Sequence, residues 1–343
     1  MELSRRVFLK RFALLAVTVA AFGPLVACGP KSSKESVRNV VLIGWDSADR
    51  DRVWECLDRA ELPNTARLIE EGGIIAIDHI DGESITVTKP GWTQVLTGYG
   101  WHTTAVFSNI IFRQVHEGYT IFERLKEHFG HDKFVTVAIV GKSHIGAEKH
   151  QLFEKCKQSM EEFVSPEGKY MDDDVVVSRS LEFMEEYKDK PFFFFVMLGD
   201  LDIMGHVYGE DSTEYHDALV HCDALTGDIV AKLKELGLYD DTLVYITSDH
   251  GHDGVPREQT SEFYRGAKFN GLPYKYFHHG CPNVFLATND PGITRTGAYP
   301  SKTPAGTLLD IAPTILTRFG LDLDEIDPPL YGSPLVDRIG IEA

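Results

Sequence analysis

Five short runs of β-branched, aromatic and other apolar residues recur along the chain and restrict its fold more than any other feature. They lie at residues 39–45, 134–140, 192–198, 242–248 and 283–288. Helix-like stretches accompany them at residues 63–71, 122–129, 173–187, 212–236 and 306–319. Because nearly continuous apolar strands that alternate with helices form a parallel sheet covered on both faces, the sequence predicts an α/β fold. We expect a three-layer αβα sandwich with a largely parallel central sheet.

The first 28 residues have the pattern of a sorting signal, which is not part of the fold. Adjacent Arg5 and Arg6 precede an apolar run that is shorter than the roughly 20 residues of a membrane span, and this pattern resembles a twin-arginine export signal. The run ends in LVAC at Cys28, which resembles the lipobox where a bacterial lipoprotein is cleaved and acylated. An uncleaved signal anchor is the alternative interpretation of the same segment.

These motifs predict three parts of the chain: a twin-arginine signal with lipobox at residues 1–28, a polar tether at 29–37 and a single folded domain at 38–343. The expected partners are the twin-arginine export machinery and the membrane, through a lipid on Cys28. The expected location is that of an exported, membrane-anchored lipoprotein, in the periplasm or on the outer cell surface.

The chain is strongly acidic, with a formal net charge of −18. Binding of nucleic acid through a broad face requires clustered lysine and arginine, so nucleic acid is not an expected partner. Any anionic substrate must therefore be held by a local feature of the fold. The cysteines after residue 28 are widely spaced and form no CxxC pair, which argues against a zinc–thiolate site and leaves their pairing in disulfides open. They are Cys56, Cys156, Cys222 and Cys281.

Aspartate and histidine recur next to the predicted strands. They are Asp46, Asp200, Asp202, His206, Asp249, His250, His278 and His279. Parallel α/β sheets bind ligands outside the carboxyl ends of their strands. Ordinary turn chemistry explains any one of these aspartates, but it does not explain the recurrence of histidine beside them. Carboxylate oxygen and neutral imidazole nitrogen are ligands of zinc and similar dications, so three aspartates and three histidines would furnish two adjacent metal sites.

A hydroxyl stands at the start of a predicted helix in the segment TKPGWTQVLTG, residues 88–98. Proline favours the first positions of a helix, so Thr88 is expected at a helix N-terminus, where backbone N–H groups and the helix dipole favour an anion. The hydroxyl is then either a simple N-cap or a nucleophile for an anionic substrate. Thr86 is the rival hydroxyl.

Together these motifs resemble the alkaline phosphatase superfamily, and within it the type I phosphodiesterase and nucleotide pyrophosphatase branch. The resemblance rests on the order of Asp46, TKPGWTQVLTG, DIMGH at 202–206, TSDHG at 247–251 and HGCPN at 279–283, and it extends to LLDIAPTILTRFGL near the C-terminus. It implies an alkaline-phosphatase-like catalytic domain that is a metal-dependent phosphoric ester hydrolase. Thr88 would be its nucleophile, a phospho-threonine its intermediate and a small-molecule phosphate ester its substrate.

The resemblance also implies the ligands of two divalent metal ions, Zn²⁺ or, as the alternative, Mn²⁺. Asp46, Thr88, Asp249 and His250 would hold the ion that activates the nucleophile. Asp202, His206 and His279 would hold the ion that stabilises the leaving group and supports hydrolysis of the intermediate. Asp200 is the alternative to Asp202 as a ligand, and His278 is the alternative to His279.

Two further motifs bear on the substrate. Asn109 follows Thr88 by 21 residues, the offset at which this branch carries an asparagine that binds a phosphoryl oxygen together with the backbone N–H after the nucleophile. The segment GKSHIG at 141–146 resembles the GKWHLG element of sulfatases, so Lys142 and His144 are expected to contact the substrate. An ordinary loop asparagine and a solvated loop are the alternatives.

Three other functions remain open alongside the phosphodiesterase. A phosphomonoesterase of the same superfamily would use Lys142 or Lys89 for the additional charge of its substrate, whereas a diesterase calls for an apolar pocket. A sulfatase would need a CxPxR-like nucleophile motif and a calcium site of oxygen ligands, but here Thr88 is followed by KPG and histidines occur among the ligands. A non-catalytic metal-binding lipoprotein would be expected to have lost some of these residues.

Overall fold

The computed structural model describes residues 37–79, 86–146, 153–252, 255–256, 268–277, 281–293 and 303–336. The chain divides into two compact units, residues 1–32 and 33–343, and the first lies outside the described residues. The expected signal with Cys28 and the expected ligand His279 also lie outside them. Among the helices that the structure describes, none has both the length and the apolar composition needed to cross a membrane.

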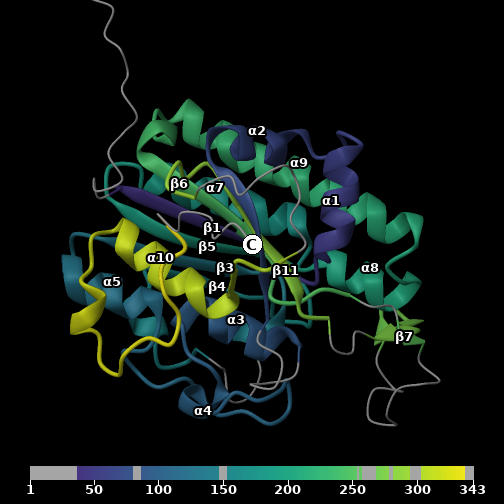
Figure 1. Ribbon diagram of the computed structural model, residues 1–343, viewed down its shortest axis with the longest axis horizontal. Coiled ribbons are helices and arrows are strands. Elements are labelled where there is room, and N and C mark those ends of the chain that lie inside the picture. Colours follow the sequence, from purple (N-terminus) through teal and green to yellow (C-terminus); the bar gives the residue numbers. More distant parts are fainter. Residues whose placement is uncertain are drawn as a thin grey trace, which may run out of the picture. The chain divides into compact units, whose positions relative to one another are not determined.

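A mixed, mostly parallel sheet forms the centre of the domain (Figure 1). Within the described residues its strands are β1 (Asn39–Trp45), β2 (Gly73–Asp78), β3 (Val135–Val140), β4 (Glu162–Val164), β5 (Phe192–Leu198), β6 (Thr242–Thr247), β11 (Asn283–Thr288) and β12 (Gly306–Thr307). Their order across the sheet is β12-β2-β11-β6-β1-β5-β3-β4. The central strand β1 pairs in parallel with β5 and β6, while β11 is antiparallel to both of its neighbours, β6 and β2.

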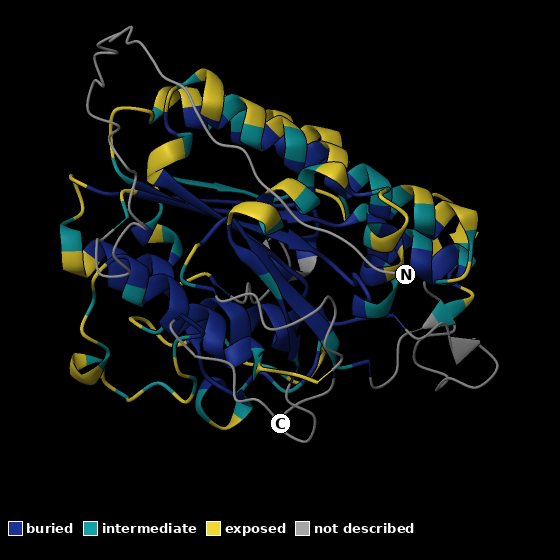
Figure 2. Ribbon diagram, turned by 45° about the horizontal axis from the view of Figure 1, so that its top comes forward, coloured by how far each residue is buried: buried dark blue, intermediate teal, exposed yellow. Residues whose placement is uncertain are grey.

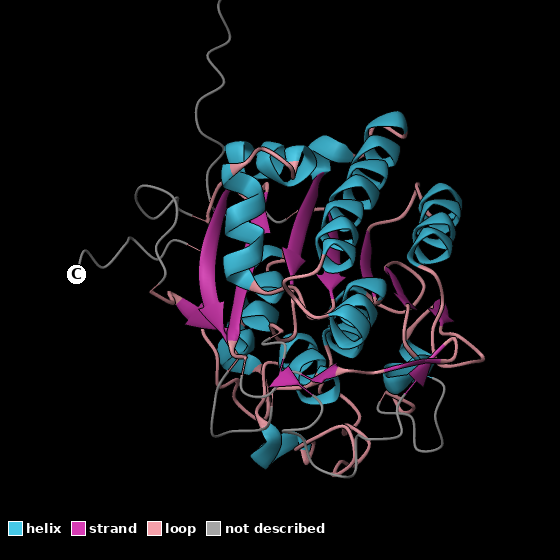
Figure 3. Ribbon diagram, turned by 90° about the vertical axis from the view of Figure 1, so that its right-hand side faces the viewer, coloured by secondary structure: helices cyan, strands magenta, loops and turns pink. Residues whose placement is uncertain are grey.

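Helices cover both faces of this sheet (Figure 1, Figure 3). One layer contains α3 (Thr88–Thr97), α5 (Ile121–Phe129) and α10 (Ile311–Arg318), and the other contains α1 (Arg50–Asp58), α2 (Pro63–Glu71), α7 (Asp173–Glu186) and α9 (Thr213–Glu235). Further α-helices in the described residues are α4 (Trp101–Thr104), α6 (Ser143–Gly146) and α8 (Asp200–Tyr208). The predicted αβα sandwich with a largely parallel sheet is confirmed.

The two apolar cores follow from the alternation of side chains along β1. Val40 and Leu42 belong to the core shared with α3, α5 and α10, whereas Val41 and Ile43 belong to the core shared with α1, α2, α7 and α9. All four side chains are fully buried. Figure 2 shows the strands buried along most of their length, with exposed residues mainly on the outer sides of the helices. This two-sided burial explains why the strand sequences are apolar at successive positions.

The predicted elements agree with the observed ones except in a few places. The stretches at 39–45 and 63–71 coincide with β1 and α2. The stretch predicted as one helix at 306–319 is instead β12, a short 3-10 helix and α10, because Thr307 and Asp310 form a capping box that starts the helical turn after an extended segment. The predicted stretches did not include the strands β2 and β4 or the helices α1, α4, α6 and α8.

A glycine in β1 lets α3 approach the sheet closely. Gly44 is the next residue after Leu42 on the same face of the strand. A Cβ on Gly44 would lie 2.3 Å from Cη2 of Trp92, far closer than a normal contact. Trp92 is fully buried and donates through Nε1 to Asp46 Oδ2 (3.3 Å). The absence of a side chain at residue 44 therefore leaves the space that the Trp92 ring occupies, so that α3 can pack closely and Trp92 can contact Asp46.

We expect Gly44→Ala to lower the free energy of unfolding by about 1–3 kcal/mol, since a methyl group forced into a filled core has a cost of this size. Equilibrium unfolding in urea would measure the change. Gly168→Ala is the matched control, because a Cβ at that exposed glycine meets no atom within 4 Å. Equal stability of the two variants would show that α3 does not depend on this contact.

Candidate active site

Three neighbouring strands bring the predicted ligands to one edge of the sheet. Asp46 follows β1, Asp249 and His250 follow β6, and Asp202 lies in the first turn of α8, directly after β5. Because β6, β1 and β5 are adjacent and parallel, their carboxyl ends lie at the same edge. The sheet topology thus gathers side chains that are up to about 200 residues apart in sequence.

These four residues form one buried group, the Asp–His cluster (Asp46, Asp202, Asp249 and His250). One ligand atom from each of Asp46, Asp202 and His250 can be chosen so that all lie within 4.8 Å of one another. His250 Nε2 lies 3.9 Å from Asp46 Oδ1 and 3.2 Å from Asp249 Oδ2. The N–H of Ser47 donates to the other oxygen of Asp249, Oδ1 (3.2 Å), and so fixes the orientation of that carboxylate.

The ammonium group of Lys142 lies inside the Asp–His cluster. Its Nζ donates to Asp46 Oδ1 (2.7 Å) and to Asp202 Oδ2 (2.6 Å), and the residue is only 2% exposed. Lys142 follows β3, in the segment that resembles the sulfatase element. In this structure its charge balances the carboxylates, and its contact with a substrate stays a prediction.

Burial destabilises the ionised form of these carboxylates. It raises the pKa of Asp46 to about 7 although Lys142 lowers it, and it raises the pKa of Asp249 well above its usual value, with the charge of Asp46 acting in the same direction. One ammonium group thus stands among three carboxylates. Asp249 Oδ2 accepts no hydrogen bond from the described residues. Further positive charge is needed for all three acids to stay ionised.

Two histidines present nitrogen lone pairs to these carboxylates. His250 Nδ1 lies 2.9 Å from the carbonyl oxygen of Gly251, and His206 Nδ1 lies 2.9 Å from that of Tyr276. A carbonyl only accepts, so each Nδ1 carries a proton, and burial lowers the pKa of both rings, to about 4 for His250, which keeps them neutral. His206 Nε2 then faces Asp202 Oδ2 at 3.5 Å as an acceptor. This set of oxygen and nitrogen donors fits a divalent ion such as zinc.

Thr88 is the first residue of α3, and Val87 rather than Thr88 holds the N-cap position. The first turn of this helix packs against the Asp–His cluster, because a Cβ on Gly91 would lie 2.5 Å from the carbonyl oxygen of Asp249. Thr88 itself is 4% exposed. The structure therefore places a helix N-terminus, which favours anions, next to a group of buried carboxylates.

Asn109 lies at the same helix start. Its Oδ1 accepts a hydrogen bond from the Lys89 N–H (2.8 Å), the group expected to face a phosphoryl oxygen. The Lys89 ammonium donates to the Asn109 carbonyl oxygen (3.0 Å) and lies 3.8 Å from the ring centroid of Phe112. The asparagine is thus close to the predicted nucleophile, while its contact with a substrate stays a prediction.

Other predicted residues are only partly placed. The side chain of His144, in α6, lies outside what the structure describes, and so does His279. Sequence reasoning missed His252, which is fully buried with its ring centroid 5.5 Å from that of His206. Burial lowers the pKa of His252 to about 3. Its position two residues after His250, in TSDHGH, is the signal that could have drawn attention to it.

The segment before β11 also reaches this site. The Tyr274 ring stacks on His206 with ring centroids 4.5 Å apart, and the Lys275 N–H donates to the His206 carbonyl oxygen (2.8 Å). Two short strand pairs lie in the same segment: β7 (Val255–Pro256) with β10 (Tyr276–Phe277), and β8 (Lys268–Phe269) with β9 (Leu272–Pro273). The described part of this segment therefore contacts His206, a predicted metal ligand, from outside the sheet.

Curated proteins of known name resemble this chain in sequence. The bis(5'-adenosyl)-triphosphatase enpp4 of Mus musculus is 27% identical over 242 residues, which are 64% of this chain and 48% of that protein. The Homo sapiens protein of the same name is 23% identical over 253 residues, 69% of this chain and 52% of that protein. The chain thus spans about half the length of these relatives. A steryl-sulfatase of Rattus norvegicus is 30% identical over 160 residues, 43% of this chain and 26% of that protein.

Solved structures share the fold. The murine ectonucleotide pyrophosphatase/phosphodiesterase 5 gives a TM-score of 0.58 at 13% identity, covering 83% of this chain and 95% of that one. BT4656, solved with its substrate D-glucosamine-2-N,6-O-disulfate, gives a TM-score of 0.58 at 15% identity, covering 88% and 79%. A protein of the alkaline phosphatase superfamily from Vibrio parahaemolyticus gives a TM-score of 0.53 at 18% identity, covering 88% and 70%. The alkaline-phosphatase-like architecture is confirmed.

The family model described as type I phosphodiesterase / nucleotide pyrophosphatase matches residues 40–270. The matched region begins in β1 and extends past β6, so it contains the whole Asp–His cluster and Thr88. The family consists of hydrolases that act on phosphoric esters. Because the match covers more than half of its length, the chain belongs to the type I phosphodiesterase and nucleotide pyrophosphatase family.

Proposed function

We propose that this chain is a metal-dependent hydrolase of phosphoric esters, of the phosphodiesterase or nucleotide pyrophosphatase type, with a small-molecule phosphate ester as substrate. The observation that carries the proposal is the buried Asp–His cluster packed against the first turn of α3, where Thr88 lies. Family membership supports it. Among similar proteins, a threonine-to-alanine variant of the murine ectonucleotide pyrophosphatase/phosphodiesterase 5 is inactive and was solved in complex with AMP.

The proposed cofactor is a pair of divalent metal ions, with Zn²⁺ favoured by the histidines and Mn²⁺ as the alternative. Asp46, Asp249, His250 and the hydroxyl oxygen of Thr88 would hold one ion. Asp202, His206 and His279 would hold the other. The assignment of His279 rests on the sequence alone. When bound, such ions lower the pKa of a coordinated hydroxyl and stabilise negative charge on phosphoryl oxygens.

Thr88 is the proposed nucleophile. Its Oγ1 would form a bond to phosphorus while the bond to the leaving alcohol breaks, which gives a phospho-threonine. Water would then cleave the phospho-threonine, release phosphate or its monoester and restore the hydroxyl. The N-terminus of α3 favours the phosphoryl oxygens through its dipole, and Asn109, from its place at the Lys89 N–H, would donate its side-chain amide to the same oxygens.

Two sequence motifs favour a diester over a monoester as substrate: DIMGH at 202–206 and the offset of Asn109 from Thr88 both match the diesterase branch. A monoester dianion calls for an extra cation at its third oxygen. The Lys142 ammonium is held by Asp46 and Asp202, and the Lys89 ammonium is held by the carbonyl oxygen of Asn109. Bound metal ions would replace Lys142 at Asp46 and Asp202, so Lys142 and Lys89 are the cations that a monoester would use.

The remaining alternatives have less support. A sulfatase would need a different nucleophile motif from Thr88 followed by KPG. A non-catalytic metal-binding lipoprotein would bind the ions without turnover. Export through the twin-arginine machinery and anchoring by a lipid on Cys28, with a place in the periplasm or on the outer cell surface, are proposals that rest on the N-terminal sequence alone.

The test of this function compares four chromogenic compounds: p-nitrophenyl phosphate, bis-p-nitrophenyl phosphate, a nucleoside p-nitrophenyl phosphate and p-nitrophenyl sulfate. The purified chain is loaded with zinc or manganese, and its metal content is measured by mass spectrometry. We expect hydrolysis of the diesters that disappears on chelation and returns with metal. Preference for the monoester would reassign the substrate class. Hydrolysis of the sulfate alone, or metal binding without any turnover, would contradict the proposal.

Thr88→Ala is expected to lower kcat for the diester by about 10³-fold or more, because the attacking oxygen is removed. Thr88→Ser keeps a hydroxyl and should retain part of the activity. Thr86→Ala is the matched control, since Thr86 is the neighbouring threonine and is equally buried at 4% exposure. If Thr86→Ala abolishes turnover and Thr88→Ala does not, the assignment of the nucleophile is wrong.

Lys142→Met is expected to tighten metal binding by about tenfold or more, as measured by calorimetry or a competing chelator. The ammonium and a metal ion compete for the same carboxylate oxygens, and two like unit charges about 4 Å apart repel by about 4 kcal/mol at an effective dielectric constant of 20. After chelation the variant should unfold at a lower temperature than the wild type, because Asp46 and Asp202 lose a buried partner.

Lys126→Met is the control for this substitution. Lys126 is likewise a buried lysine, but it pairs with Glu161 and donates to the carbonyl oxygen of His131. Its replacement should therefore leave the metal affinity unchanged, whatever its effect on stability. Equal or weaker metal binding by Lys142→Met would show that the ammonium does not compete with the metal.

A further inference from the structure

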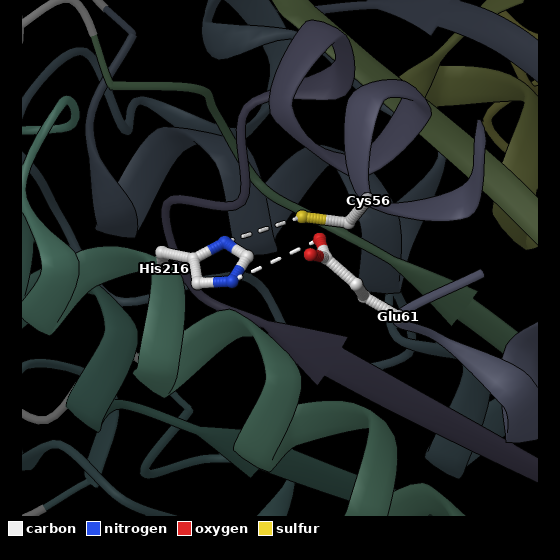
Figure 4. Close-up of side chains that lie close together, drawn as sticks. All are labelled: Cys56, Glu61 and His216. Carbon is white, nitrogen blue, oxygen red and sulfur yellow. Dashed lines mark hydrogen bonds and ion pairs between the residues drawn. The ribbon is translucent and has the colours of Figure 1, made fainter. Parts of the chain in front are cut away.

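A second group of metal-binding side chains shares no residue with the Asp–His cluster (Figure 4). Cys56 lies in α1, Glu61 in the connection between α1 and α2, and His216 in the first turn of α9. One ligand atom from each can be chosen so that all lie within 4.8 Å of one another. Cys56 is a free thiol, as are the other three described cysteines. The sequence argued against a zinc–thiolate site because no two cysteines are close, but here three different donor types meet.

The Cys56–His216 separation is close to that of neighbouring ligands in a zinc site, whereas Glu61 lies near the opposite nitrogen of the same ring. Cys56 Sγ lies 3.6 Å from His216 Nδ1, and Glu61 Oε2 lies 3.8 Å from His216 Nε2. Figure 4 shows the imidazole ring facing both of the other side chains. With Zn–S of about 2.3 Å and Zn–N and Zn–O of about 2.0–2.2 Å, ligand atoms in a tetrahedral site are roughly 3.4–3.6 Å apart. One ion binds only one nitrogen of an imidazole, so rotation of the partly exposed Glu61 or His216 side chain is required to bring all three donors onto that ion.

The three side chains line a cavity of about 280 Å³. Its other charged residues are Arg52, Glu55, Arg59, Glu210 and Asp211. With Glu61 included, carboxylates outnumber guanidinium groups in the wall by four to two, so the cavity suits a cation. Cys56 is 1% exposed, so an ion would reach its sulfur from the cavity side.

Arg59 is the present partner of two of these donors. Its Nε donates to Glu61 Oε2 (3.0 Å), and its Nη2 lies 3.7 Å from Cys56 Sγ. The Arg59 side chain is 54% exposed, and an ion pair at such a position contributes little, so the guanidinium can turn toward solvent when an ion binds. Burial raises the pKa of the Cys56 thiol, so the thiol keeps its proton until a metal displaces it.

We propose that Cys56, Glu61 and His216 bind one divalent ion of the zinc class, with water from the cavity as the fourth ligand. Thiolate, imidazole and carboxylate together select zinc or cobalt over calcium and magnesium, which take oxygen ligands. The ion would join α1 to the first turn of α9. This site does not depend on the proposed hydrolase function, because it uses other residues and a sulfur ligand.

Cobalt substitution tests the site by a signal that the Asp–His cluster does not give. The full-length chain is stripped of metal by chelation and titrated with Co²⁺ under reducing conditions without added thiol. A thiolate ligand gives Co²⁺ a sulfur-to-metal charge-transfer absorption in the near ultraviolet, whereas oxygen and nitrogen ligands do not. We expect this band in the wild type and its loss in both Cys56→Ser and His216→Asn, together with one bound ion fewer per chain.

His221→Asn is the matched control. His221 lies on the same helix, α9, but pairs with Asp174 (3.0 Å), so its replacement should keep the band. Glu61→Gln preserves the shape of the side chain and should weaken Co²⁺ binding, because a neutral amide oxygen is a poorer ligand than a carboxylate. Circular dichroism checks that each variant is folded, and His216→Asn keeps the test decisive if Cys56→Ser does not fold.

Two results would overturn the proposal: no charge-transfer band in the wild type, or a band that persists in Cys56→Ser. Both are read from absorption and metal content rather than from turnover. A failure of this site is therefore distinguishable from a failure of the proposed hydrolase function, which is read from chromogenic substrates and from the Thr88 variants.

Discussion

Three carboxylates, those of Asp46, Asp202 and Asp249, are buried together where adjacent parallel strands end, and the rest of the site is arranged around their charge. Removing a carboxylate from water costs several kcal/mol even after the protein relaxes, so each of them requires compensation. Lys142 contributes one positive charge, while the neutral ring of His250 contributes a lone pair and no charge. The cluster is thus suited to more cationic charge than the described side chains supply.

Helix ends contribute to this compensation but are too weak to complete it. Both α3 and α8 begin at the same edge of the sheet, with Thr88 and Asp202 in their first turns. The positive end of a helix dipole stabilises a nearby anion by about 0.3–1 kcal/mol at an ordinary site. Two such ends offset only part of the burial cost of three carboxylates. The rest of the burial cost has to be offset by cations at this edge of the sheet.

Much of this arrangement could be predicted because it is encoded locally. Strands that are buried on both faces are apolar at every position, so β1, β5 and β6 were recognisable, and the acids that follow them could be assigned to one edge. The direction of β11 was not recognisable, because its composition is the same for parallel and antiparallel pairing.

Lys142 shows the same limit within the site. Its place after a strand predicts that it is near the substrate edge, but not that its ammonium faces Asp46 and Asp202. The meeting of Cys56 with His216 was also beyond sequence spacing, since α1 and α9 come together only through tertiary packing.

The turn that carries Asp46 is held in a strained conformation. Ser47 has a φ of 69°, in the left-handed region that residues with a Cβ rarely adopt, at a cost on the order of 1–3 kcal/mol. Its N–H donates to Asp249 Oδ1 (3.2 Å), and its carbonyl oxygen accepts a hydrogen bond from the Tyr215 hydroxyl (2.8 Å). These bonds maintain the strain and hold two of the three buried acids at a fixed separation. Tyr215 directly precedes His216, so an ion bound at Cys56, Glu61 and His216 would immobilise the same helical turn that supports Asp46.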